Sequence, residues 1–145
     1  MSDSAVESAP DIGSRLPHGY PFRLLDRVAD GSVVVLVAAN AAQLRGASEL
    51  PPMLAVEVMA QAALVVLASA GGEFSDAERA GEAPRVGLLA GIDSAVFHAP
   101  LRAGDRVRAQ AALLGRMGPI VKVRCELRRD DELVAEAGLL LALQR

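Results

Sequence analysis

Met53-Leu-Ala-Val-Glu57-Val-Met-Ala-Gln61-Ala-Ala-Leu-Val-Val-Leu-Ala-Ser-Ala70 is the stretch of the chain that decides the fold. Pro51 and Pro52 precede it and suit the first turn of a helix, where a missing N–H costs nothing. Gly71-Gly72 follows it and supplies a stop. A helix that is apolar on all sides is a buried one. We therefore predict a central helix from Pro52 to Ala70 that a sheet encloses.

The same stretch is long enough, at about 18 residues, to raise a membrane-spanning interpretation. Glu57 and Gln61 lie in its first half, however, and no charged flank sets an orientation across a membrane. We favour the helix buried in protein and predict no membrane association.

Glu57 is the only charged residue of this stretch. Taking an ionised carboxylate out of water costs at least several kcal/mol, even after the protein relaxes. Gln61 follows four residues later on the same helical face, where its amide can orient the carboxylate. We take the pair as the leading candidate for chemistry. The alternative is a buried carboxylate that Gln61 and backbone donors merely satisfy.

The bulk composition indicates one domain without a nucleic-acid partner. The chain has 145 residues and a net charge of −3, which leaves no basic footprint for nucleic acid. Its single cysteine, Cys125, excludes an intrachain disulfide and fits a reducing cytoplasm. The two histidines and this cysteine stand in no metal-ligand spacing, so we predict no metal site. We also expect no cofactor. Residues 1–14 lack the regions of a signal peptide and are predicted as a disordered lead-in to a domain spanning 15–145.

Strand patterns flank the helix on both sides. Before it, Phe22–Val28 and Ser32–Ala39 are predicted strands joined by a hairpin turn at Asp30-Gly31. After it, Gly71–Pro84 is rich in Gly, Ser, Asp and Glu and is predicted as a mobile linker.

The C-terminal half alternates between apolar and polar residues, as half-buried antiparallel strands do. Arg106–Ala111 and Ile120–Arg128 show this pattern, and Cys125 falls on an apolar face, where we expect it to pack. Turns are predicted at Gly115–Pro119 and Asp130-Asp131. The last strand, Leu133–Leu143, is apolar on both faces from Gly138 onward, so we expect a cover on each side: the helix and a partner subunit, or a neighbouring sheet.

The order is thus two strands, one buried helix and three or four antiparallel strands. An α+β domain with a single sheet curled around one helix accounts for it most economically. This architecture is the hotdog fold, which usually pairs its sheets edge to edge in a dimer.

Three motifs, in the right order, resemble those of the bacterial (3R)-3-hydroxyacyl-acyl carrier protein dehydratases. The match as a whole runs from about Leu16 to the C-terminus. The first is Leu16-Pro-His18-Gly-Tyr20-Pro-Phe22-Arg-Leu-Leu-Asp26-Arg-Val28, and the second is Glu57-Val-Met-Ala-Gln61. The third is Leu89-Ala-Gly-Ile-Asp93-Ser-Ala-Val-Phe97-His-Ala-Pro100-Leu-Arg-Ala-Gly104-Asp105. A divergent branch from aryl-polyene pigment pathways is more similar still.

The resemblance implies a hotdog dimer that eliminates water from a 3-hydroxyacyl thioester to give a trans-2-enoyl thioester. Elimination needs one group to take the α proton and another to protonate the leaving oxygen. In the family a histidine of one subunit is the base and the motif glutamate of the other is the acid, a role that falls to Glu57. The implied partner is a substrate on acyl carrier protein or coenzyme A.

The chain departs from the family at two positions. Gln43 stands where the family has its histidine, and glutamine cannot act as a base. Pro52, which has no N–H, replaces the glycine that holds the thioester carbonyl. The N–H groups of Met53 and Leu54 are then the candidates for that carbonyl.

Several interpretations stay open. His18 either belongs to the structural opening motif, which we favour, or takes the place of the missing base. His98 is predicted to lie on a solvated rim, and the arginines Arg102, Arg106 and Arg108 on a wet strand face and not on a carrier-protein surface. Three functions are considered. The chain is a dehydratase, or it is a non-catalytic subunit that contributes Glu57 to the site of a histidine-bearing paralogue. A hotdog thioesterase agrees less well with the motifs. It is expected as a homodimer, a heterodimer or a higher oligomer.

Overall fold

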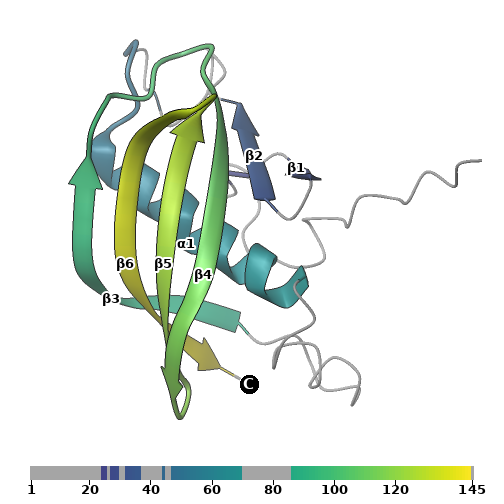
Figure 1. Ribbon diagram of the computed structural model, residues 1–145. Helices are drawn as coiled ribbons and strands as arrows, with labels where there is room; N and C mark the ends of the chain where they lie inside the picture. The colour runs from purple at the N-terminus through teal and green to yellow at the C-terminus, as the bar shows by residue number, and fades with distance from the viewer. Residues whose placement is uncertain are drawn as a thin grey trace, which may run out of the picture.

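In the part of the chain that the structure describes, an antiparallel sheet curls around a single α-helix (Figure 1). The computed structural model describes residues 24–25, 27–29, 32–36, 44, 47–69 and 86–144. The predicted lead-in at 1–14, His18, Gln43 and the predicted linker at 71–84 lie outside the described residues.

Within the described residues six strands form the sheet, in the spatial order β1-β2-β4-β5-β6-β3. The helix α1, Pro52–Ser69, connects the first two strands to the last four. The strand bounds are β1 Arg27–Ala29, β2 Ser32–Leu36, β3 Val86–Phe97, β4 Arg106–Met117, β5 Ile120–Arg129 and β6 Glu132–Gln144. Although β3 precedes β4 in the chain, it lies beside β6 at the edge of the sheet opposite β1. The four long strands β4, β5, β6 and β3 are therefore neighbours in the sheet.

The helix α1 lies diagonally across the concave face of the sheet (Figure 1). It begins at Pro52, as predicted, and runs to Ser69, while Ala70 lies outside the described residues. Its apolar side chains are buried on several sides, since Val56, Val58 and Met59 are each at most 1 % exposed. The facing sheet contributes much of the remaining core, including Val107, Val121, Val123, Leu127, Leu139 and Leu141.

The period-two predictions for the C-terminal strands are confirmed. In β5 the apolar positions Val121 and Val123 are buried, whereas Lys122 and Arg124 between them are exposed. The start of β4 alternates in the same way. Because successive strand residues point to opposite faces, this alternation places one face of the sheet on the helix and the other in solvent.

Two predicted boundaries are wrong. The first strand begins at Arg27 and not at Phe22, and Leu24 and Leu25 precede it outside any strand. The backbone N–H of Leu24 donates to the Gln61 side chain instead of a neighbouring strand, and Leu25 packs into the core. The predicted turn at 115–119 also begins too early.

Strand β4 in fact continues to Met117, past a register shift between Leu113 and Gly115. The turn is Gly118-Pro119, because Met117 pairs with Ile120 and Gly118 takes a positive φ of 58°. The predicted Asp130-Asp131 turn is confirmed by the pairing of β5 with β6 on either side of it. Ala29 pairs with Ser32, as a two-residue hairpin requires, although its turn residues lie outside the described part.

Alternation does not predict β3, because its apolar residues do not alternate with polar ones along the strand. Its large side chains stay 38 to 47 % exposed, and the exposed ones are Leu88, Leu89, Ile92, Val96 and Phe97. Two register shifts interrupt its pairing with β6. We predicted that both faces of β6 are covered, and the structure shows full burial on one face only. Leu139 and Leu141 on that face are buried, whereas Leu140 and Ala142 on the other face are half-buried. Among the described residues, no helix combines the length and apolarity needed to cross a membrane.

Candidate active site

Glu57 and Gln61 lie on one face of α1 and interact directly. The Gln61 Nε2 donates a hydrogen bond of 3.0 Å to Glu57 Oε1, so the predicted orientation of the carboxylate by the amide is confirmed. Gln61 is 1 % exposed, whereas Glu57 is half-buried. The amide is therefore part of the interior, and the carboxylate lies at its boundary.

A backbone group far away in the sequence holds the other end of the Gln61 amide. The N–H of Leu24 donates to Gln61 Oε1 at 3.0 Å. Leu24 belongs to the first motif and Gln61 to the second, so two motifs that are 37 residues apart meet at this amide. The motif spacing alone does not show this contact, because it depends on how the segment before β1 packs against α1.

The beginning of α1 differs from the prediction in part. The N–H of Leu54 donates to the carbonyl of Pro51 at 2.9 Å, so it is used within the first turn. Of the two N–H groups proposed for a thioester carbonyl, that of Met53 is then the better candidate. The Met53 side chain is 60 % exposed. A substrate-binding role for Met53 stays a prediction.

His98, the histidine that the structure describes, lies on the exposed rim, as predicted. Its Nε2 is 3.7 Å from Glu136 Oε2, and Arg124 donates to the other oxygen of the same carboxylate at 3.1 Å. This side chain is engaged with the outer face of the sheet. His18, the other candidate for the base, lies outside the described residues.

A cavity of about 220 Å³ lies at the start of α1. Pro52 and Ala55 from the helix form one wall, and Phe97 and His98 form another. Successive helical residues are about 100° apart, so Glu57, two positions after Ala55, points to the opposite side of α1. The cavity and the Glu57 carboxylate therefore lie on different sides of the helix.

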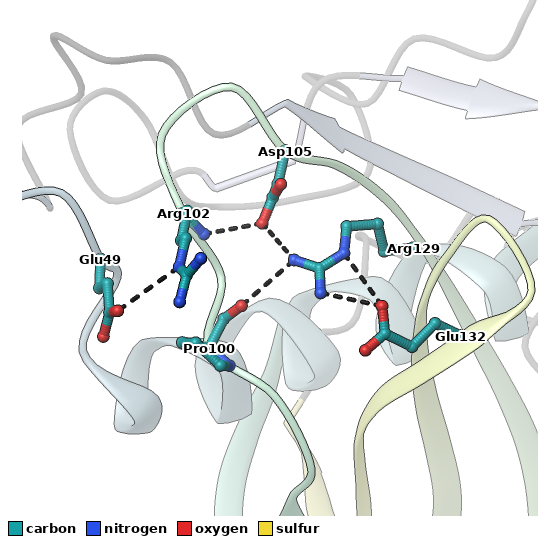
Figure 2. A network of polar contacts seen from close by, with 6 residues as sticks. All are labelled: Glu49, Pro100, Arg102, Asp105, Arg129 and Glu132. Atoms are coloured by element: carbon teal, nitrogen blue, oxygen red, sulfur yellow. Dashed lines mark hydrogen bonds and ion pairs between the residues drawn. The ribbon is translucent and has the colours of Figure 1, made fainter.

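An ion-pair network fixes the loop beside this cavity (Figure 2). Arg129 donates to Asp105 Oδ2 at 2.7 Å, to Glu132 Oε2 at 2.9 Å and to the Pro100 carbonyl at 3.3 Å. Asp105 also accepts the Arg102 N–H at 2.8 Å. The bonds to Glu132 and then to Asp105 raise the pKa of Arg129 above its ordinary value. Sequence reasoning missed this network, although Pro100 and Asp105 stand in the third motif.

The remaining candidates are surface or core positions. Arg102, Arg106 and Arg108 are exposed, as predicted for a wet face. Cys125 is 1 % exposed, with its Sγ 3.7 Å from the Met59 carbonyl oxygen, which confirms a packing role. Within the described ranges, no three His, Cys, Asp or Glu side chains gather as metal ligands would.

Comparison with known proteins places this geometry in a family. A family model described as ApeP-like, ApeP dehydratase, matches residues 10–143. The chain belongs to the ApeP-like dehydratase family. The match spans all three motifs, and so includes Glu57, Gln61 and Leu24.

Curated relatives agree with this family, and a solved structure shares the fold. The 3-hydroxyacyl-[acyl-carrier-protein] dehydratase FabZ of Granulibacter bethesdensis is 34% identical, over 92% of this chain and 81% of that protein. The FabZ of Lactococcus lactis is 32% identical, over 93% and 94% of the two chains. The dehydratase heterocomplex ApeI:P from Xenorhabdus doucetiae has a similar fold, with a TM-score of 0.73, 23% identity, and coverage of 92% of this chain and 91% of that one.

Proposed function

We propose that this protein eliminates water from carrier-bound (3R)-3-hydroxyacyl thioesters and gives trans-2-enoyl thioesters, with Glu57 as the acid. The observation that carries the proposal is the Glu57 carboxylate held at 3.0 Å by a buried Gln61, within a chain of the ApeP-like dehydratase family. The FabZ relatives act on hydroxyacyl groups of acyl carrier protein, which supports the same class of substrate here.

The proposed reaction uses Glu57 to protonate the leaving group. A base takes the α proton, the new double bond forms between the α and β carbons, and the β hydroxyl departs as water with a proton from Glu57. Glu57 and the base then return to their starting states by exchanging protons with solvent. A half-buried carboxyl is suited to this step, because it is reachable from a site yet held in one orientation by Gln61.

The base is either His18 or a group of a second subunit. The edge strand β3 supports an assembly, since its exposed apolar side chains need cover and its outer edge pairs with no described strand. The ApeI:P dehydratase is a heterocomplex, which supports testing a related histidine-bearing subunit as well as a second copy of this chain. A cytoplasmic location stays a prediction from the single cysteine.

The test measures formation of the enoyl thioester from a 3-hydroxyacyl carrier protein by mass spectrometry. Wild type, Glu57→Gln and His18→Ala are compared, each alone and mixed with a histidine-bearing homologue. We expect Glu57→Gln to lose about 10²- to 10⁴-fold in kcat, the usual contribution of a general acid. Glu126→Gln is the matched control, because Glu126 pairs with Arg128 on the outer face of the sheet.

The arms of this experiment separate the hypotheses. An active wild type that His18→Ala abolishes favours His18 as the base. Activity only in the mixture, still dependent on Glu57, favours a shared site between two different subunits. Full activity of Glu57→Gln in every mixture would overturn the proposed role of this carboxylate.

A further inference from the structure

We infer that Arg129 is a positioning residue for the elimination, because it fixes the loop that holds the beginning of α1, the helix that carries Glu57. We call the contact between residues 48–50, just before α1, and residues 101–103, in the loop between β3 and β4, the strap. The inference rests on the proposed function, since it concerns the placement of the acid. It adds a role for a residue that lies outside all three motifs.

The first step is the structure of the strap. The N–H of Leu50 donates to the carbonyl of Leu101 at 2.7 Å, and the N–H of Ala103 donates to the carbonyl of Ser48 at 3.0 Å. Leu50 is 9 % exposed and Leu101 is 4 % exposed, so water does not replace this contact at low cost. The helix begins at Pro52, two residues after Leu50. The strap therefore ties the start of α1 to the loop between β3 and β4.

The second step is the clamp that Arg129 places on this loop (Figure 2). Its guanidinium donates to the carbonyl of Pro100 at 3.3 Å and to the carboxylate of Asp105 at 2.7 Å. These two residues stand on either side of the loop part that belongs to the strap, and Asp105 also accepts the Arg102 N–H. Glu132 Oε2 accepts from the Nη2 and Nε atoms of Arg129 at 2.9 Å and 3.3 Å. Because these bonds are charge-assisted and directional, the guanidinium holds the loop in one position.

The third step is the effect of the strap on the acid. Glu57 lies five residues after Pro52, which is about 7.5 Å along the axis of a continuous helix, so a shift of the helix start also moves the carboxylate. The apolar packing of α1 against the sheet is non-directional and leaves its position along the axis less sharply fixed than hydrogen bonds do. A misplacement of about 1 Å can lower a rate by about 100-fold. The clamp at Arg129 is therefore coupled to catalysis through the start of the helix.

Two substitutions at Arg129 test the inference in the subunit composition that shows turnover. Arg129→Met removes the clamp but keeps an apolar stem, and we expect kcat to fall by about 10- to 100-fold with little change in KM. Arg129→Lys keeps a charge for Asp105 without the planar fork, so we expect an intermediate kcat. Arg128→Met is the matched control and should keep the wild-type kcat, because Arg128 contacts the Glu126 side chain and the Asp131 carbonyl.

A reversible cross-link of the strap separates positioning from overall stability. Glu49 and Arg102 lie directly opposite each other between the two hydrogen bonds of the strap. In such a non-hydrogen-bonded pair the Cα atoms are about 4.5 Å apart, a separation that a disulfide can bridge. Glu49→Cys with Arg102→Cys, added to Arg129→Met, should restore kcat when oxidised and lose it again on reduction with a phosphine. Cys125 is buried and does not compete for the new disulfide.

Amide hydrogen exchange at Leu50 and Ala103 supplies a readout that is independent of turnover. Protection should fall in Arg129→Met and return with the disulfide, while thermal unfolding shows that each variant is folded at the assay temperature. If Arg129→Met does not fold, Arg129→Lys takes its place in every comparison. An active wild type with unchanged kcat or unchanged protection in the variant, or a kcat that the disulfide does not restore, overturns the inference while the proposed function stands. A wild type without turnover in any mixture overturns both.

Discussion

Gln61 joins two parts of the chain that the sequence separates widely. Its amide oxygen is held by the Leu24 N–H, and its nitrogen holds Glu57. A buried amide costs free energy unless its atoms are paired, so each contact helps to justify the other. This explains why a polar residue is tolerated in the middle of an apolar helix, and why it stands one helical turn from the acidic residue.

Cys125 shows how burial determines reactivity at a single residue. It lies at the centre of β5, on the face that packs against α1. Burial raises the pKa of its thiol from an ordinary 9.0 to about 12. Because the thiolate is the reactive form, the thiol should be inert in the folded protein at neutral pH.

We predict that Cys125 is not labelled by an aromatic disulfide reagent at pH 8 in the native protein and reacts fully in urea. The absorbance of the released thiolate measures the reaction. Because the pKa of the Cys125 thiol is higher in the folded protein, this thiol loses its proton at a lower pH in the unfolded chain than in the folded one. Stability should therefore decline above about pH 9. Rapid stoichiometric labelling of the folded protein would contradict the buried position.

At the level of elements, Arg129 connects the end of β5 to the loop between β3 and β4. It contacts the side chains of Asp105 and Glu132 and the carbonyl of Pro100 (Figure 2). The same loop is tied to the segment before α1, since Leu50 donates to the Leu101 carbonyl at 2.7 Å. The network therefore holds together three segments around the start of the helix.

We expect Arg129→Met to lower the free energy of unfolding by about 1 to 2 kcal/mol, because several charge-assisted bonds are lost but the group is partly solvated. Urea unfolding followed by circular dichroism measures the change. Arg106→Met is the control, since Arg106 is exposed on β4 and should change stability by less than about 0.5 kcal/mol. Equal unfolding midpoints for the two variants would show that the network contributes little.

For the whole molecule, the decisive feature is the unequal cover of the sheet. One face is closed by α1, whereas the edge strand β3 presents apolar side chains that are 38 to 47 % exposed. A long apolar edge strand is a ready template for pairing with another strand. This agrees with the sequence-based expectation of a dimer, which stays a prediction.

We predict that Ile92→Lys on β3 weakens assembly, because a charge on an edge strand opposes pairing with a second sheet. Size-exclusion chromatography with light scattering should give about twice the chain mass of 15.1 kDa for wild type and a lower mass for the variant. Leu114→Lys is the control, since Leu114 is 57 % exposed on β4 and distant from this edge in strand order. If the wild type is monomeric alone, the measurement is repeated with a histidine-bearing homologue. Equal masses for Ile92→Lys and Leu114→Lys would contradict pairing through β3.

The sequence by itself determined the elements whose pattern is local. The largely apolar helix, the alternation of β5 and the turn at Asp130-Asp131 follow from side-chain period and turn chemistry, which depend on near neighbours in the chain. The pair Glu57 and Gln61 was also visible, because residues four apart share one face of a helix.

Only the tertiary structure decided the contacts between distant segments. The Leu24 bond to Gln61, the Arg129 network and the place of β3 beside β6 depend on how the sheet curls around the helix. Backbone donors are the same in every residue, and an edge strand lacks the one-sided burial that creates alternation. No local sequence pattern predicts these contacts, because the packing of distant segments determines which donor meets which acceptor and which strands pair.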